Sequence, residues 1–177
     1  MTQNTTVLVT GASGFVGIHC VAALLKEGYQ VRGTIRSLKK EAALRKTVAK
    51  FIAADERFTL VEADLLNDAG WDAAVEGCEY VLHVASPFPL MEPKHEDDLI
   101  IPAREGTLRV LRAAAEKNVK RVVLTSSVAA VAYGHPKEKT QFDESDWSLA
   151  DSPTISAYSK SKTLAEIRTP DTLLRTE

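Results

Sequence analysis

The sequence contains few of the residues that would mark a secreted, metal-binding or membrane protein. Its only two cysteines, Cys20 and Cys78, have no paired spacing and no neighbouring histidine cluster, so neither a disulfide framework nor a zinc site is indicated. No stretch approaches the roughly 20 apolar residues of a membrane span. The first residues, 1–5, are polar and leave no room for a signal peptide. We therefore expect a cytoplasmic protein without a membrane partner.

An excess of one charge sign is also lacking. The 22 Lys and Arg against 24 Asp and Glu give a formal net charge of -2, which provides no electrostatic reason to expect nucleic acid as a partner. The hydrophobic fraction of 45% and the charged fraction of 26% are ordinary for a globular protein. A chain of 177 residues favours one domain. A small molecule is the expected partner.

Apolar runs typical of strands alternate with segments of helical periodicity. The runs predict five strands, at 6–10, 29–35, 58–62, 80–84 and 121–125. The periodic segments predict helices at 14–27, 39–54, 72–77 and 98–118, and a last helix that begins near Ile155 and ends before Pro170. The polar stretch 133–153 is interpreted as an active-site loop. This alternation predicts an α/β fold with a doubly wound parallel sheet, the Rossmann architecture.

A glycine-rich turn joins the first predicted strand to the first predicted helix. The segment Thr-Gly-Ala-Ser-Gly-Phe-Val-Gly at 10–17 provides backbone conformations open to glycine and a helix N-terminus with free N–H groups. Close approach of a pyrophosphate also excludes a β-carbon. We interpret the turn as a dinucleotide site; a glycine-rich turn without a ligand is the alternative. The residues predicted to bind the cofactor here are Gly11, Ser13, Gly14, Phe15, Val16 and Gly17.

Basic residues follow the second predicted strand, where dinucleotide-binding folds distinguish NAD from NADP. An acidic residue at this point would favour NAD. Arg36 instead presents several N–H donors to a 2′-phosphate, and Lys40 adds a second positive charge one helical turn later. The alternative is a solvated basic helix start.

Two short segments after the third and fourth predicted strands complete the expected cofactor site. Asp64 and Leu65 would lie near an adenine, whose amine a carboxylate can bind. The segment Ala85, Ser86 and Pro87 places small residues beside the central part of the cofactor. Either segment alone has an equally good structural interpretation, because small and acidic residues often end strands.

Tyr158 and Lys162 are four residues apart and therefore share one face of the last predicted helix. A neighbouring ammonium favours the phenolate form, which suits a tyrosine to acid–base work. Ser126 and Ser127 end the fifth predicted strand, at the edge where open α/β sheets bind ligands. The alternative is a surface Tyr–Lys pair that covers the sheet.

Two histidines are weighed as other acid–base candidates. His83 lies within an apolar strand and is interpreted as a hydrogen-bonded core residue. His95 lies in an acidic loop, and neither histidine has a convincing partner in the sequence. We therefore place the chemistry at the Ser-Tyr-Lys group.

Taken together, these motifs resemble the extended short-chain dehydrogenases/reductases over residues 5–167. The motifs are those at 10–17, Arg36, 64–65, 83–87, 125–127 and 158–162. Segments 84–87, 106–111 and 142–147 further resemble the branch of dihydroflavonol reductase, cinnamoyl-CoA reductase and fungal aldehyde/ketone reductases.

This resemblance implies an NADPH-dependent oxidoreductase that reduces an aldehyde or ketone to an alcohol by hydride transfer. It implies that Ser127, which matches the family position better than Ser126, orients the carbonyl oxygen, and that Tyr158 protonates that oxygen. Lys162 would bind the nicotinamide ribose and assist Tyr158, with Thr125 also at the cofactor. Arg36 and Lys40 look like the 2′-phosphate ligands of this branch.

The sequence departs from the family at two places. Glu105 precedes Gly-Thr where many extended members have asparagine. Relatives also continue well beyond the Tyr-Lys helix, whereas 168–177 does not resemble them, so we expect a C-terminally truncated chain with a dinucleotide domain at 1–167, a tail and no substrate domain. The fifth strand would then be a sheet edge. A fragment, a shortened product and a gene-model error remain open.

Two other functions are compatible with these motifs. Nucleotide-sugar epimerases and dehydratases share the glycine turn and the Ser-Tyr-Lys group but usually retain NAD, which Arg36 disfavours. A non-catalytic dinucleotide-binding product would fit the missing substrate half. The physiological substrate, and the choice between monomer and homodimer, are left open.

Overall fold

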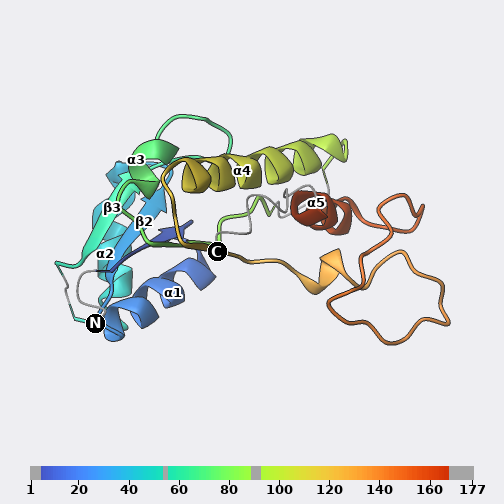
Figure 1. Ribbon diagram of the computed structural model, residues 1–177, viewed down its shortest axis with the longest axis horizontal. Helices are drawn as coiled ribbons and strands as arrows, with labels where there is room; N and C mark the ends of the chain where they lie inside the picture. Colours follow the sequence, from blue (N-terminus) through green and yellow to red (C-terminus); the bar gives the residue numbers. More distant parts are fainter. Residues whose placement is uncertain (1–4, 54–55, 89–92, 168–177) are drawn as a thin grey trace.

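The computed structural model describes residues 5–53, 56–88 and 93–167, and they form one parallel sheet with helices on both faces (Figure 1). The strands are β1 (Thr6–Thr10), β2 (Gln30–Ile35), β3 (Phe58–Glu62), β4 (Tyr80–His83) and β5 (Arg121–Leu124). Their order is β3-β2-β1-β4-β5, and every neighbouring pair is parallel. The predicted five-stranded doubly wound sheet is therefore confirmed.

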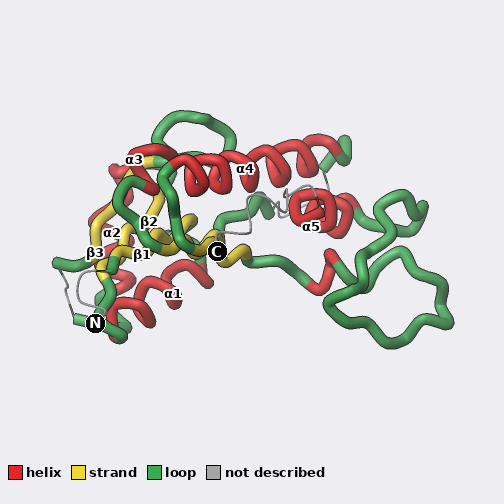
Figure 2. The backbone as a smooth tube through the Cα atoms, in the orientation of Figure 1, coloured by secondary structure: helices red, strands yellow, loops and turns green. Residues whose placement is uncertain are grey.

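In the described parts of the chain, five α-helices surround the sheet, and four of them cover its two faces in pairs (Figures 1 and 2). They are α1 (Phe15–Lys26), α2 (Glu41–Val48), α3 (Trp71–Val75), α4 (Asp97–Glu116) and α5 (Ala157–Ile167), with short 3-10 turns η1 (Leu38–Lys40) and η2 (Val128–Ala130). One core lies between the sheet and α3 and α4, and the other lies under α1 and α2. Helix α5 packs against α4 and η2 beyond β5.

Strand β1 lies at the centre and contributes to both cores. Leu8 belongs to the core under α3 and α4, and Val9 to the core under α1 and α2; both side chains are fully buried. A strand with helices on both faces must be apolar at successive positions, which explains its uninterrupted apolar sequence. Within the described residues β5 pairs with β4 alone, and Val123 on it is 52% exposed, as expected for an edge.

The predicted helix boundaries lie within about two residues of the described ones, except at the end of α2. The helix expected to reach residue 54 ends at Val48, where the Lys50 and Phe51 N–H groups donate only three residues back, to the Thr47 and Val48 carbonyls, in a tight turn. The last helix begins at Ala157, after Ser156, whose hydroxyl accepts the N–H of Ser159. The expected helix end before Pro170 and the tail 168–177 lie outside the described residues.

A buried polar pair joins the ends of β1 and β4. The Thr10 hydroxyl oxygen accepts the N–H groups of Val84 (3.1 Å) and Ala85 (3.0 Å), so its own hydrogen is directed to Nδ1 of His83 at 2.8 Å. His83 Nδ1 is then the acceptor and Nε2 carries the proton. The predicted core position of His83 is confirmed, although Nε2 has no partner among the described residues.

Burial lowers the pKa of His83 to about 4, and the positive charge of Lys162 contributes in the same direction. The unfolded imidazole binds a proton near pH 6.5, whereas the folded one does not. The contribution of His83 to the free energy of unfolding is therefore fully present above pH 6.5 and is lost as the pH drops towards 4. We expect a loss of about 2 kcal/mol from this group between pH 7 and pH 5. Urea unfolding of the wild type and of His83→Gln at both pH values measures it.

The His83→Gln variant is expected to lose less stability than the wild type over this pH interval, since glutamine does not titrate. The exposed His95 provides the matched control, because His95→Gln removes an imidazole that is not buried. Equal pH dependence in the wild type and in His83→Gln would contradict the assignment.

Candidate functional site

A cavity of about 630 Å³ extends along the carboxyl ends of all five strands. This is the edge at which open α/β sheets bind ligands, and the volume is typical of a ligand site. Its lining consists of Gly11, Ser13, Gly14, Phe15, Val16 and Gly17 after β1, Thr34, Ile35 and Arg36 at β2, Ala63, Asp64, Leu65, Leu66 and Trp71 after β3, Val84, Ala85, Ser86, Pro87 and Phe88 after β4, and Thr125 after β5. A separate hollow of about 350 Å³ near α2 contains none of the predicted site residues.

The glycine turn is held in place from β2 and leaves the start of α1 open. Gly11 has a positive φ of 65°, and its N–H donates to the Thr34 hydroxyl at 3.0 Å. A Cβ on Gly17 would lie well under 3.0 Å from the Gly11 carbonyl oxygen, so the turn tolerates no side chain there. Gly14 precedes α1 without a side-chain cap, which leaves first-turn N–H groups available to an anion.

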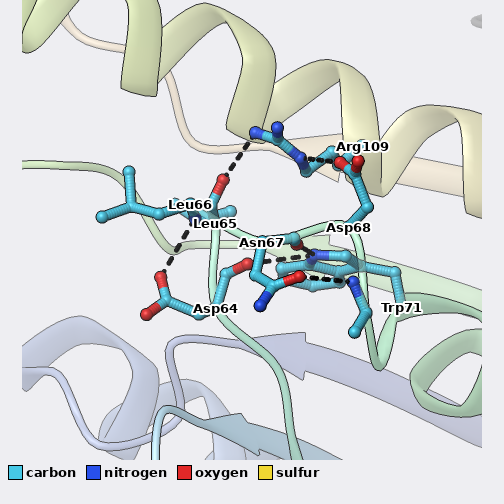
Figure 3. Close-up of polar contacts among 8 residues, drawn as sticks. Asp64, Leu65, Leu66, Asn67, Asp68, Trp71 and Arg109 are labelled. Atoms are coloured by element: carbon cyan, nitrogen blue, oxygen red, sulfur yellow. Dashed lines mark hydrogen bonds and ion pairs between the residues drawn. The ribbon is translucent and has the colours of Figure 1, made fainter.

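The loop after β3 is fixed by hydrogen bonds from α3 and α4 (Figure 3). The Asp64 carboxylate accepts the Leu66 N–H at 3.0 Å, and the Trp71 indole N–H donates to the carbonyl oxygens of Asp64 (3.2 Å) and Asn67 (3.0 Å). Arg109 of α4 donates to the Leu65 carbonyl at 2.9 Å and also pairs with Asp68. The predicted residues Asp64 and Leu65 are therefore presented to the cavity by a well-supported loop.

The structure separates the two basic residues predicted after the second strand. Arg36 is exposed and lines the cavity. Lys40 is exposed at the end of η1 and does not line it. Between them the Leu38 N–H donates to a Glu62 carboxylate oxygen at 3.0 Å, which fixes the chain that carries both cations. Arg36 is thus the basic group at this end of the cavity.

The two serines after β5 have different partners. The hydroxyl oxygen of Ser127 accepts the Ala129 N–H at 3.1 Å and caps η2, which leaves its hydrogen free for a further acceptor. The Ser126 hydroxyl donates its hydrogen to the carboxylate of Glu166 on α5. Of the two serines, Ser127 is therefore the one whose hydroxyl hydrogen is not donated to a carboxylate.

Helix α5 brings Tyr158 and Lys162 to the same edge. The Tyr158 ring packs edge to face against Phe88, a lining residue, with 5.3 Å between ring centroids. The Lys162 ammonium donates to the Thr125 carbonyl at 3.4 Å. Burial lowers the pKa of Lys162, and the carboxylate of Glu166 opposes that shift. A small hollow lined by Lys162 adjoins the cavity at Ala85, Ser86 and Thr125, which line both.

The predicted residues are thus brought together unevenly. The glycine turn, Arg36 and the residues after β3 and β4 share one cavity, whereas Ser127 and Tyr158 do not line it. Thr34, Trp71 and Phe88 line it and were not predicted. Phe88 directly follows Pro87 and could have been included, but the contribution of Trp71 depends on how the loop folds back and has no local signal.

Other classes of site receive no support from the described residues. No helix in 5–53, 56–88 or 93–167 combines the length and apolarity needed to cross a bilayer. The same part of the chain contains no group of three or more His, Cys, Asp or Glu side chains suited to hold a metal ion.

Comparison with known proteins shows that the chain is similar to reductases. It is 41% identical over 168 residues to a cinnamoyl-CoA reductase of Medicago truncatula, covering 90% of this chain and 50% of that protein. It is 40% identical over 173 residues to a dihydroflavonol 4-reductase of Callistephus chinensis, covering 91% and 45%. The predicted resemblance to this branch is confirmed. The chain spans about half the length of these curated relatives.

The fold comparison agrees with the sequence comparison. The crystal structure of yeast methylglyoxal/isovaleraldehyde reductase complexed with NADPH matches with a TM-score of 0.77 and 31% identity, over 92% of this chain and 51% of that one. The family model described as "NAD dependent epimerase/dehydratase family" matches residues 7–169. The glycine turn, the Tyr-Lys helix and all of the sheet except Thr6 lie within that match, and the chain belongs to the NAD dependent epimerase/dehydratase family.

Proposed function

We propose that the chain binds NADPH and contributes the catalytic residues for reduction of an aldehyde or ketone to an alcohol. The observation that carries the proposal is the continuous cavity over all five strand ends, with Arg36 after β2 and Thr125 beside Lys162 after β5. The yeast reductase complexed with NADPH, at 31% identity, supports the choice of cofactor. The reductases among the relatives support the choice of reaction.

The lining residues fit a dinucleotide. The glycine turn has no room for a β-carbon at Gly17, and α1 begins without a side-chain cap, so a pyrophosphate would bind there on backbone N–H groups. The loop at Asp64 and Leu65 would take the adenine. Arg36 would bind the 2′-phosphate through charge-assisted hydrogen bonds, which an NAD ribose does not offer.

The protein's own groups provide orientation and the proton. The bound cofactor would supply the hydride, from nicotinamide C4 to the carbonyl carbon. Ser127 donates a hydrogen bond to the carbonyl oxygen, and Tyr158 transfers its proton to that oxygen, so the carbonyl gains one hydride and one proton. The ammonium of Lys162 stabilises the phenolate that remains on Tyr158, which then recovers a proton from solvent.

The glycine turn provides a test of cofactor binding. Gly17→Ala is expected to weaken NADPH binding by more than about 100-fold, because the new β-carbon displaces the Gly11 carbonyl and with it the turn. Titration of NADPH fluorescence measures the dissociation constant. Gly77→Ala is the matched control, since its Cβ meets no atom within 4 Å; its φ of 69° costs stability but leaves binding unchanged. Equal binding by Gly17→Ala and the wild type would contradict the proposed site.

Arg36 provides a test of the choice between the two dinucleotides. Arg36→Ser is expected to weaken NADPH binding by about 10- to 100-fold and to change NADH binding by less than about three-fold, because only NADPH carries the 2′-phosphate. The two dissociation constants are measured side by side. Tighter binding of NADH than of NADPH by the wild type would favour the epimerase or dehydratase alternative.

Tyr158, the proposed proton donor, provides a test of the reaction. Tyr158→Phe is expected to lower kcat for carbonyl reduction by about 100-fold or more, while the NADPH dissociation constant changes by less than about two-fold. NADPH oxidation is followed with a panel of aldehydes and ketones. Absence of turnover by the wild type with every carbonyl tested, or full turnover by Tyr158→Phe, would refute the proposed reaction.

A further inference from the structure

Consecutive residues at the end of β5 are bound by consecutive turns of α5. The Thr125 carbonyl accepts a hydrogen bond from the Lys162 ammonium at 3.4 Å, and the next residue, Ser126, donates its hydroxyl to Glu166. Lys162 and Glu166 are four residues apart and share one face of α5. All four of these residues line the same small hollow. The proposed reaction uses Lys162 and leaves the role of Glu166 unexplained.

We infer that Glu166 is a positioning residue for Lys162: it fixes α5 on the end of β5 through Ser126, and its carboxylate is the counter-charge of the ammonium. The catalytic importance of this role rests on the proposed function. The effect of Glu166 on the Lys162 ammonium can be measured without any turnover.

The charges around Lys162 make a nearby carboxylate important. On β4, the buried His83 is neutral near pH 7, because burial lowers its pKa to about 4. Burial also lowers the pKa of Lys162, and the Glu166 carboxylate raises it. On α5 itself, Tyr158 lies one turn earlier, and Lys160 is paired with Glu96. Glu166 therefore favours the ammonium form against the effect of burial.

Carboxylates of α4, the helix packed against α5, have other partners. Glu96 pairs with Lys160 at 2.8 Å, and Glu105 pairs with Arg104 at 2.9 Å. Asp97 and Asp98 lie in the first turn of α4 and are exposed. The Glu96–Lys160 pair thus links α5 to α4 without involving Lys162, and it offers a matched comparison for Glu166.

Two variants separate the charge of Glu166 from its anchoring contact. Glu166→Gln removes the charge but keeps an oxygen that can accept the Ser126 hydroxyl hydrogen. Ser126→Ala removes the anchor but keeps the charge. Glu96→Gln is the control, because it neutralises a carboxylate that binds α5 through Lys160 instead. Thermal unfolding of each variant checks that the fold is retained.

The first measurement is competitive acetylation of lysine amines between pH 7 and 11, read by mass spectrometry of the peptide that contains Lys162. In Glu166→Gln we expect Lys162 to be labelled about three-fold faster at pH 8 than in the wild type, since the unprotonated amine is the reactive form. In Glu96→Gln, Lys162 is expected to be acetylated at the wild-type rate. Equal Lys162 labelling in Glu166→Gln and the wild type would overturn the counter-charge.

The second measurement separates kcat from cofactor binding. Ser126→Ala is expected to lower kcat for carbonyl reduction by about three- to ten-fold with an unchanged NADPH dissociation constant, because a displaced α5 misorients Tyr158 and Lys162. Unchanged kcat would overturn the anchoring role. If the labelling result holds while the wild type reduces no carbonyl, the counter-charge of Lys162 is supported and the proposed function alone fails.

Discussion

The hydroxyl group of Thr10 is the contact on which the arrangement of the site depends. It accepts hydrogen bonds from two backbone N–H groups after β4 and donates its own hydrogen to Nδ1 of the buried His83. Strands β1 and β4 are where the chain changes direction across the sheet, and a cleft at their ends is open by topology. Together with the β1–β4 pairing, this three-way contact sets the separation between the glycine turn and the segment at Ala85.

The sequence predicted the strands well because each strand is a short run that contains β-branched or other apolar residues, and the central strand β1 is apolar towards both cores. Buried parallel strands leave little ambiguity between runs such as 6–10 and the helices around them. The predicted end of α2 was wrong because Phe51 and Ile52 continue the apolar spacing, although the Lys50 and Phe51 N–H groups already donate three residues back and tighten the backbone into a turn. Periodicity reports which side chains are buried and does not show whether the backbone between them is helical.

Where a motif and a strand end coincide, as at Gly17, Arg36 and Asp64, the residues predicted for the site line the cavity. The sequence gives no local signal for a side chain that reaches this edge from elsewhere in the chain. Trp71 supports the loop after β3 from the start of α3, and Glu166 binds Ser126 from α5. The sequence distinguished the adjacent serines only by a family match, whereas their hydrogen-bond partners show which hydroxyl has a free hydrogen and which donates to a carboxylate.

Helix α4 supports both halves of this edge of the sheet. Near its middle, Arg109 holds the loop after β3 by the Leu65 carbonyl, while α5 packs along the same helix and Lys160 pairs with Glu96 at its start. A helix of 20 residues is a rod of about 30 Å. The distance between the loop and α5 is therefore set by the rise of a single helix. A substitution that tilts this rod would alter the span of the cavity and leave the chemical groups at either end intact.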